Sequence, residues 1–304
     1  AAPGALIELQ KTLSSVTLAY SIVDATASEM VPKQAERVEA WLAEASRAQL
    51  DWPLGGSSCC DSIYYLRSLH ATAAGVVAND DQLLQQGVRA LRTALAEMRP
   101  DGSLPRERAH GHRAFALQFN GTGYLVMIGR LLERQGYDVS SIRSDGAALS
   151  DLVSHAQSLF RNPLAIYDVY GRPQRLDFMR LSASLAWFEA AGTAPYDGSL
   201  AELMVYHRPA FNSDLGGFLT LYFFKPAEWS PDDLRPRRVM GTPISAPEHC
   251  GFLARWQEER DTDWRLACEA AFHQAPPDPK VRGARVYGTQ RDRQNETQGN
   301  GGAL

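Results

Sequence analysis

The sequence predicts an all-α protein, and three observations support this fold class. Through most of the first two thirds of the 304-residue chain, apolar residues recur every three or four positions, which is typical of amphipathic helices. Short segments rich in Gly, Pro, Asp and Ser separate these stretches, so successive helices can fold back on each other. Only residues 217–224 are rich in strand-forming side chains. An antiparallel helical bundle or a closed ring of helical hairpins is therefore expected.

The helices expected before residue 225 follow from this periodicity and from residues that start and stop helices. In chain order they span residues 5–28, 33–50, 61–78, 80–98, 113–135, 146–161, 176–192 and 197–206. Pro32 stands where a helix start tolerates proline, and Asn79 with Asp80 provides a cap for the fourth helix. Gly121 and Gly123 predict a break or kink in the fifth helix.

The character of the chain changes after Lys225, which predicts two regions, 1–225 and 226–304. The first is the helical domain. The second begins with a Pro- and Arg-rich stretch of little periodicity, continues with one helix at about residues 250–273, and ends in a polar stretch that we expect to be disordered.

Composition and charge exclude two classes of partner. The chain holds 31 Lys and Arg against 35 Asp and Glu, a formal net charge of −4, without a clustered basic segment. Nucleic-acid binding needs a clustered positive face, so we expect no nucleic-acid partner. No apolar run approaches the roughly 20 residues of a membrane-spanning helix, so we expect no membrane insertion.

The four cysteines, Cys59, Cys60, Cys250 and Cys268, are too few and too irregularly spaced to predict a disulfide framework. The adjacent pair also lacks the spacing of a zinc site. A bridge from that pair to Cys250 or Cys268 stays open, but buried or half-buried thiols are favoured.

Several short segments follow one another in an order that points to a known family. They are Glu39-Ala-Trp-Leu42 followed by Asp51-Trp52, Ala74-Gly-Val-Val-Ala-Asn79, Asp101-Gly-Ser-Leu-Pro105, His112-Arg-Ala-Phe115 with Tyr124-Leu-Val-Met127, and Arg208-Pro-Ala-Phe-Asn-Ser-Asp-Leu-Gly-Gly217. In this order the sequence resembles the alginate lyase family of polysaccharide lyases. The resemblance implies an α/α toroid of antiparallel helical hairpins, incomplete here, with a poorly structured C-terminal tail. It also implies a groove for an acidic polysaccharide, a periplasmic or secreted location and no cofactor.

The chemistry of such a lyase follows from the acidity of a uronic acid. Its C5 proton becomes removable only when hydrogen bonds or positive charge neutralise the neighbouring carboxylate. A base, usually Tyr or His, then takes that proton, and an acid protonates the departing O4. The product of this β-elimination is an unsaturated sugar.

The sequence departs from the family where that chemistry is placed. The Asn-Asn-His-x-Tyr-Trp motif of the family falls on Asp61-Ser-Ile-Tyr-Tyr-Leu66, which retains only Tyr65. The catalytic Arg falls on His110 and the catalytic Tyr on Leu117, and no counterpart of an active-site lysine is identified.

Tyr65, His110 and Arg113 are the predicted catalytic residues. A tyrosine on the third helix can act as a base or an acid, although a packing role is the favoured alternative for Tyr64 and Tyr65 alike. His110, His112 and Arg113 form the densest basic group of the chain and can bind a carboxylate, unless they are a solvated loop before the fifth helix. Two histidines two residues apart do not make a metal site, so none is predicted.

The predicted substrate-binding residues are Tyr64, His112, Asn120, Tyr124, Arg208 and Asn212. Asn120 and Tyr124 lie one turn apart on the fifth helix and can face one cleft. Arg208 and Asn212 can line one end of a groove, but a structural turn explains them equally well. The third and fifth helices are expected to form the wall of the groove.

Three functional hypotheses follow. The first is a lyase that cleaves a uronate-containing, alginate-like polysaccharide by β-elimination. The second is an inactive relative that binds an acidic glycan without turnover, and the third is a helical interaction protein with no glycan ligand. The sequence predicts neither the uronate polymer, endo or exo action, nor the oligomeric state.

Overall fold

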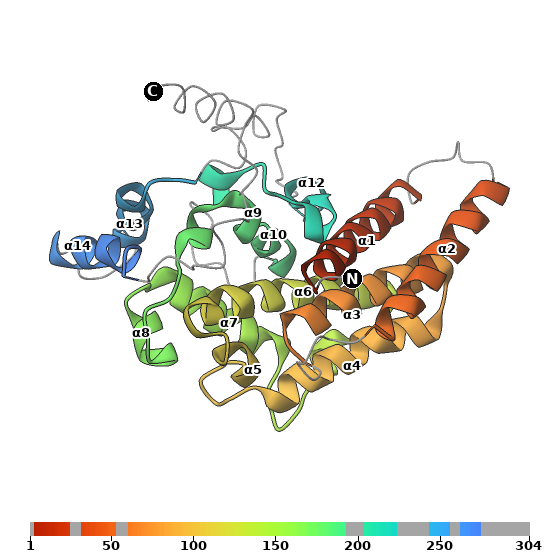
Figure 1. Ribbon diagram of the computed structural model, residues 1–304, viewed down its shortest axis with the longest axis horizontal. Coiled ribbons are helices and arrows are strands. Elements are labelled where there is room, and N and C mark those ends of the chain that lie inside the picture. Colours follow the sequence, from red (N-terminus) through yellow and green to blue (C-terminus); the bar gives the residue numbers. More distant parts are fainter. Residues whose placement is uncertain are drawn as a thin grey trace, which may run out of the picture. The chain divides into compact units, whose positions relative to one another are not determined.

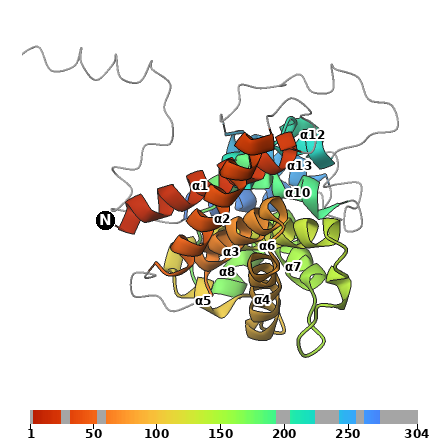
Figure 2. The ribbon, with the colours of Figure 1, turned by 90° about the vertical axis from the view of Figure 1, so that its right-hand side faces the viewer.

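The computed structural model describes residues 3–24, 32–52, 60–192, 204–223, 243–255 and 262–274, all within one unit, Ala1–Gln274. The first helices are α1 (Pro3–Asp24), α2 (Pro32–Leu50), α3 (Ser62–Ala78) and α4 (Asp81–Glu97). Helix α3 packs against the other three, which lie around it in Figures 1 and 2. These bounds confirm the first four predicted helices, while the predicted residues 25–28 lie outside the described part of the chain.

Side chains that start and stop α3 and α4 explain their sharp ends. The Asp61 carboxylate accepts hydrogen bonds from the backbone N–H groups of Ile63 and Tyr64, both at 3.1 Å. Asp80 caps α4 in the same way, and Asn79 ends α3 in the left-handed conformation at φ 51°. The predicted cap at residues 79–80 is therefore two separate caps: Asn79 ends α3, and Asp80 caps the start of α4.

Helix α6 (Ala114–Arg134) is the central helix, and it is uninterrupted. The predicted break at Gly121 and Gly123 is wrong, because these glycines serve close packing. A Cβ on Gly121 would lie 3.2 Å from Cδ2 of Tyr65, and one on Gly123 would lie 2.8 Å from Cδ1 of Trp187. The missing side chains let α3 and the Trp187 indole approach the backbone of α6.

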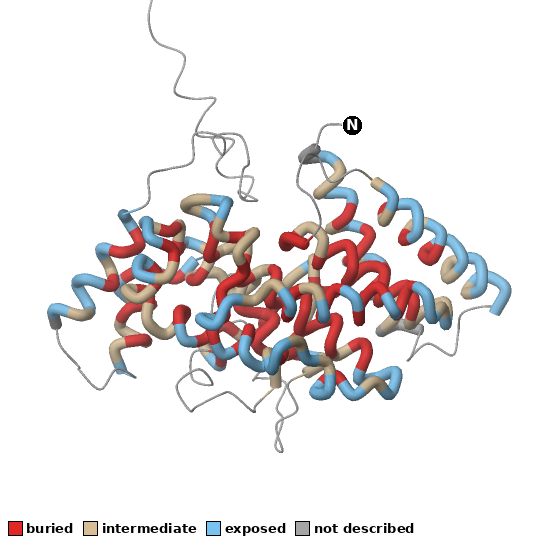
Figure 3. The backbone as a smooth tube through the Cα atoms, turned by 90° about the horizontal axis from the view of Figure 1, so that it is seen from below, coloured by how far each residue is buried: buried red, intermediate tan, exposed pale blue. Residues whose placement is uncertain are grey.

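Aromatic side chains form the middle of the core around α6. The ring of Phe119 is fully buried, and its centroid lies 5.1 to 5.9 Å from those of five other aromatic residues: Phe115, Phe160, Phe178, Trp187 and Phe188. Phe160 comes from α7 (Leu149–Arg161), which precedes the short α8 (Ala165–Tyr170). Figure 3 shows the buried residues concentrated in the middle of the helices. Burial of this kind supplies the main free energy of folding.

The predicted helix at residues 176–192 is three short elements, namely η3 (Asp177–Arg180), α9 (Ser182–Leu185) and α10 (Trp187–Ala191). The single-helix prediction is wrong because a distant segment forms hydrogen bonds with the backbone and the side chain of Arg180. Its carbonyl accepts a hydrogen bond from the N–H of Ile244 at 3.1 Å, and its guanidinium donates to the Ile244 carbonyl at 3.0 Å. Of the predicted helix at 197–206, the structure describes only residues from 204 onward, and 204–207 are helical.

The predicted strand at 217–224 is mostly helix. Strands β1 (Phe211–Asn212) and β2 (Gly217–Phe218) form a two-residue antiparallel pair around η4 (Ser213–Leu215), and α12 (Leu219–Phe223) follows. The prediction failed because periodicity cannot separate a short buried strand from a short buried helix.

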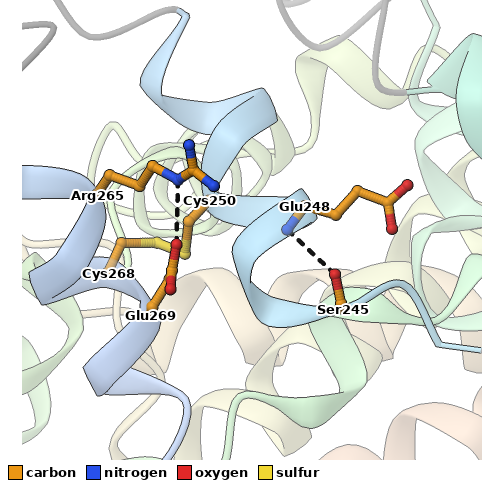
Figure 4. The surroundings of a disulfide bond; sticks show 6 residues. All are labelled: Ser245, Glu248, Cys250, Arg265, Cys268 and Glu269. Atoms are coloured by element: carbon orange, nitrogen blue, oxygen red, sulfur yellow. Dashed lines mark hydrogen bonds and ion pairs between the residues drawn. A yellow bond between two sulfur atoms is a disulfide. The ribbon is translucent and has the colours of Figure 1, made fainter. Parts of the chain in front are cut away.

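In place of the single helix expected at 250–273, the described residues after 225 form two helices. They are α13 (Ala246–Ala254) and α14 (Thr262–Ala271), and a disulfide between Cys250 and Cys268 joins them (Figure 4). The expectation of thiols is wrong, as is a bridge from either cysteine to the Cys59-Cys60 pair, and none of the described cysteines is free. Both bridged cysteines belong to the main core.

The boundary predicted at residue 225 stays a prediction, and residues 226–242 and 275–304 of the predicted extension lie outside the described residues. None of the described helices has the length and apolar character needed to cross a membrane.

Candidate functional site

A buried carboxyl group lies where α3 begins. Glu107, in the one-turn helix α5 (Pro105–Arg108), has a fully buried side chain, and its Oε1 accepts a hydrogen bond from the backbone N–H of Ser62. Burial, aided by the nearby Asp61, raises the pKa of Glu107 to about 8. The group therefore keeps its proton at neutral pH.

His110 lies beside this carboxyl group, and Arg113 follows it at the other end of the turn that opens α6. This turn is η1 (Gly111–Arg113). The His110 side chain is 40% exposed, and its Nε2 lies 3.9 Å from Oε2 of Glu107. Arg113 is exposed and forms no ion pair with any described residue. The imidazole of His110 and the guanidinium of Arg113 are thus both exposed to solvent within one short turn.

A small cavity, here called the polar pocket, opens on the side of α6 that carries Asn120 and Tyr124. Its volume is about 150 Å³, and a cavity of this size holds a six-membered ring. The segments 183–187 and 212–215 complete it. Its polar lining is Asn120, Tyr124, Ser184, Trp187, Asn212 and Asp214.

Most polar groups of the pocket have unused hydrogen-bonding capacity. The side chains of Asn120 and Ser184 form no hydrogen bond with described residues, and the indole N–H of the buried Trp187 has no partner among them. Asn212 donates through Nδ2 to the carbonyl of Ala183 at 2.7 Å, which leaves its Oδ1 to accept. Buried polar groups normally have partners, so this set is prepared for a ligand rich in hydroxyl groups.

Asp214 gives the pocket its charge. The Tyr124 hydroxyl donates to Oδ2 of Asp214 at 3.5 Å, and Nζ of Lys11 lies 3.9 Å from the same oxygen. Burial raises the pKa of Asp214, and Lys11 opposes the rise. Burial also raises the pKa of Tyr124 well above its ordinary value, so its hydroxyl stays protonated.

Ser62 connects the Glu107–His110 pair with the polar pocket. Its backbone N–H binds Glu107, and its Cβ lies 3.6 Å from the position of a Cβ on Gly121. Gly121 follows Asn120 of the pocket directly. These contacts link His110, Glu107, Ser62, Gly121 and the polar pocket in one line of neighbours, here called the strip. Ser62 and Gly121 are buried, so the middle of the strip is packed.

Helices α3 and α6 leave no room for a sugar between them at Gly121. The two helices pack directly against each other at Gly121, and the Tyr65 ring fills their interface. Tyr65 is fully buried, its hydroxyl has no hydrogen-bond partner among the described residues, and burial raises its pKa far above the ordinary value. It does not line the polar pocket.

Three predicted binding residues have structural partners. The half-buried Tyr64 accepts a hydrogen bond from Gln86 at 3.3 Å, and His112 donates through Nδ1 to the carbonyl of Pro173 at 2.7 Å. Arg208 forms a bidentate ion pair with the buried Glu189, at 2.7 and 3.1 Å. The structure thus brings together Asn120, Tyr124 and Asn212 at the pocket, and His110 and Arg113 at the other end of the strip.

Sequence reasoning missed Glu107, Ser184 and Asp214. Glu107 follows the Leu-Pro turn by two positions, and Asp214 lies inside the Phe-Asn-Ser-Asp segment that carried the family resemblance. These positions, close to or within segments already singled out, were the sequence features that could have identified both residues. Among the described residues, no group of three or more His, Cys, Asp and Glu side chains has the arrangement to hold a metal ion.

The order of these helices and the similar solved structures define the class: the fold is an all-α toroid of antiparallel helical hairpins. The chain belongs to the alginate lyase family, whose sequence profile matches residues 4–164.

Individual relatives agree with this membership. The chain is 30% identical to a polysaccharide lyase of Stenotrophomonas maltophilia (strain K279a), over 70% of this chain and 61% of the relative. It is 26% identical to an alginate lyase of Azotobacter chroococcum mcd 1, over 72% of this chain and 56% of the relative. The chain therefore spans about three fifths of the length of these relatives.

A solved structure supports the fold. A histidine-to-alanine variant of alginate lyase A1-III, complexed with a tetrasaccharide, superposes with a TM-score of 0.66 at 25% identity. The match covers 73% of this chain and 65% of that one. Alginate lyase A1-III from Sphingomonas species A1 gives a TM-score of 0.63 over 71% of this chain.

Proposed function

We propose that this protein is a polysaccharide lyase that cleaves a uronate-containing acidic polysaccharide by β-elimination. The observation that carries the proposal is the exposed imidazole of His110, whose Nε2 lies 3.9 Å from the buried carboxyl group of Glu107. The polar pocket lies further along α6. Family membership and the alginate lyases among the relatives support the reaction class.

The first step is neutralisation of the uronate carboxylate. Arg113 suits this role, because its guanidinium is exposed and has no carboxylate partner among the described residues. A guanidinium binds a carboxylate through two charge-assisted hydrogen bonds. Withdrawal of charge from the carboxylate acidifies the C5 proton.

His110 is the proposed base, and its imidazole takes the C5 proton. The C4–O4 bond breaks, a double bond forms between C4 and C5, and the imidazolium returns its proton to the departing O4. Glu107 is a positioning residue in this scheme, because its carboxyl group is buried and reaches His110 but not the substrate.

The substrate-binding part of the proposal assigns Asn120, Tyr124 and Asn212 to a neighbouring sugar unit in the polar pocket. Tyr65 has a packing role in it, since its hydroxyl lies in the α3–α6 interface. Tyr64, His112 and Arg208 hold the scaffold through their hydrogen bonds.

A periplasmic or secreted location is also proposed. The disulfide between Cys250 and Cys268 supports it, because structural disulfides persist in oxidising compartments.

The test is incubation with alginate and with other polyuronates while the ultraviolet absorbance of the unsaturated product is followed. We expect absorbance to rise with at least one polymer. Arg113→Ala should raise KM at least about tenfold through the lost bidentate contact. Arg92→Ala, at an exposed arginine of α4, is the matched control and should leave KM unchanged.

Two outcomes contradict the proposal. Salt-sensitive binding of polyuronate without product identifies the inactive glycan-binding relative instead. Neither binding nor product favours the helical interaction protein.

A further inference from the structure

A second cavity, here called the acidic cavity, lies between the C-terminal end of α4 and one face of α7. Its volume is about 680 Å³, within the range of small-molecule sites. The turn after α4 and the loop 144–147 complete its wall. Its polar lining is Arg99, Asp101, Ser144, Asp145, Asp151, Ser154, His155 and Ser158. It shares no lining residue with the polar pocket.

The lining of the acidic cavity is negatively charged. It holds three carboxylates, Asp101, Asp145 and Asp151, and one guanidinium, that of the exposed Arg99. The cation closest to Asp101 besides these is Arg108, whose Nη1 lies 3.8 Å from Oδ2. Asp145 is exposed and forms no ion pair with any described residue. The cavity therefore attracts a cation and repels an anion.

His155 adds a hydrogen-bond acceptor without a partner to this wall. The residue is 8% exposed, and its Nε2 forms no hydrogen bond with any described residue. Burial lowers the pKa of the imidazole, so the ring is neutral at pH 7. A hydrogen bond to the backbone of Asp101 opposes this fall, and since Nε2 has no partner, the donor is Nδ1. Nε2 of the neutral ring thus carries a lone pair.

These groups require a ligand that donates hydrogen bonds and carries positive charge. Carboxylates and the lone pair of an imidazole only accept, whereas an ammonium group offers three donors and a full charge. Leu95, Met98 and Pro100 add apolar surface to the cavity, which suits a chain of methylene groups. The His, Cys, Asp and Glu side chains of the described residues form no group arranged to hold a metal ion, so an organic cation fits better.

We propose that the acidic cavity is a binding site for a linear aliphatic polyamine. One ammonium group binds Asp145, and another binds between Asp101 and His155. The methylene chain between them lies over Met98 and Pro100. The site is separate from the proposed catalytic residues, and the proposal does not depend on lyase activity.

Titration calorimetry of the full chain with spermidine tests this site. We expect one spermidine to bind per protein, with an affinity that falls as salt is added, because salt screens charged contacts. Asp145→Asn should weaken binding about fivefold through the loss of one exposed charge pair. Arg99→Gln should have the opposite effect and tighten binding at least about twofold, because it removes the cation from the lining.

A third variant tests the imidazole. In His155→Asn the side-chain amide keeps a donor close to the backbone of Asp101 but lacks the Nε2 acceptor, so binding should weaken at least about threefold. Asp168→Asn, at an exposed carboxylate of α8, is the matched control and should leave the affinity unchanged. Thermal unfolding shows whether each variant is folded. Asp145→Asn and Arg99→Gln change exposed side chains, so they decide the test even if His155→Asn does not fold.

The possible outcomes do not depend on the polyuronate assay. One-to-one binding that weakens in Asp145→Asn and tightens in Arg99→Gln supports the site, with or without lyase activity. No binding, or several equivalent spermidine molecules with equal affinity in Asp145→Asn and the control, overturns it. Tighter binding of glucosamine than of spermidine also overturns the polyamine assignment. So does displacement of spermidine by Mg²⁺ that is far stronger than by Na⁺ at equal ionic strength.

Discussion

The two sides of α6 are both largely buried, but the polar groups on them differ in their hydrogen bonding. On the side of α3, the hydroxyls of Ser68 and Thr72 donate to carbonyls within the helix, and Gln86 donates to Ser68 at 3.1 Å. On the side of the polar pocket, Asn120 and Ser184 have no partner among the described residues.

The difference separates scaffold from site. A polar group with an internal partner is satisfied and has no need of a ligand, whereas an unused one in a cavity costs free energy until something binds. Tyr65 is one exception on the α3 side, and His70, through its Nε2, is another. The buried hydroxyl of Tyr65 has no described partner, but the packed interface leaves no room for a ligand beside it.

The largest expected effect concerns the aromatic core that supports both sides. Phe119→Ala should lower the free energy of unfolding by about 3–5 kcal/mol, because it leaves a cavity among five aromatic rings. Denaturant titration measures this. Leu266→Ala, at an exposed position of α14, is the control and should cost about 0.5 kcal/mol or less. A similar loss in both variants would show that the core is not centred on Phe119.

The second prediction compares two residues that were predicted from the sequence to be catalytic. His110→Ala should lower kcat at least about 100-fold, as expected for the loss of a general base. Tyr65→Phe should leave kcat unchanged, because its hydroxyl does not face the strip. Steady-state kinetics on the best polymer measure both. A large loss of kcat in Tyr65→Phe would reverse the assignment of scaffold and site.

The third prediction compares the two glycines of α6. Gly123→Ala should destabilise the fold by about 1–3 kcal/mol, because its Cβ would lie 2.8 Å from the Trp187 ring. Gly121→Ala should cost less, since its nearest contact is 3.2 Å and alanine favours the helix. Thermal unfolding ranks the variants. The reverse order would mean that α3, and not Trp187, fits α6 more tightly.

The fourth prediction concerns pH. The pKa of Glu107 is raised from 4.5 to about 8, so the folded protein holds a proton that the unfolded chain releases above pH 4.5. This group's contribution to stability is therefore fully present below about pH 4.5 and is lost as pH rises to about 8.

The matched variant for this prediction is Glu107→Gln, which keeps an acceptor for the Ser62 N–H and cannot ionise. Its stability should fall less than that of the unaltered protein between pH 5 and pH 8, as measured by urea unfolding at several pH values. Parallel curves would show that Glu107 is ionised throughout. The buried His70, whose pKa is lowered to about 4, acts with the opposite sign and is common to both proteins.

Much of the fold could be predicted from the sequence, and the failures share a cause. The four N-terminal helices and the caps at Asp61 and Asp80 follow from local periodicity and turn chemistry. The helix at 176–192 and the strand at 217–224 failed because distant partners, such as Ile244 for Arg180, decide their backbone conformation. A local sequence pattern does not show which distant residues a segment will contact.

The candidate site was only partly predictable. Asn120 and Tyr124 share a face because residues four apart on a helix do so. Asn212 joins them because the turn at 211–218 packs on the end of α9, and no spacing rule gives that contact. Glu107 was not predicted as a site residue, because a glutamate in a charged turn is normally exposed.

The sequence by itself determined the helices, their caps and the family, since each depends on neighbours within a few positions or on the order of short segments. Only the tertiary structure decided that Glu107 is buried, that Tyr65 is packed away from solvent, that Cys250 pairs with Cys268, and that Asp214 lines a pocket with Asn120. The physical reason is that burial and pairing are properties of packed elements, and they change pKa values and access in ways that residue type alone does not specify.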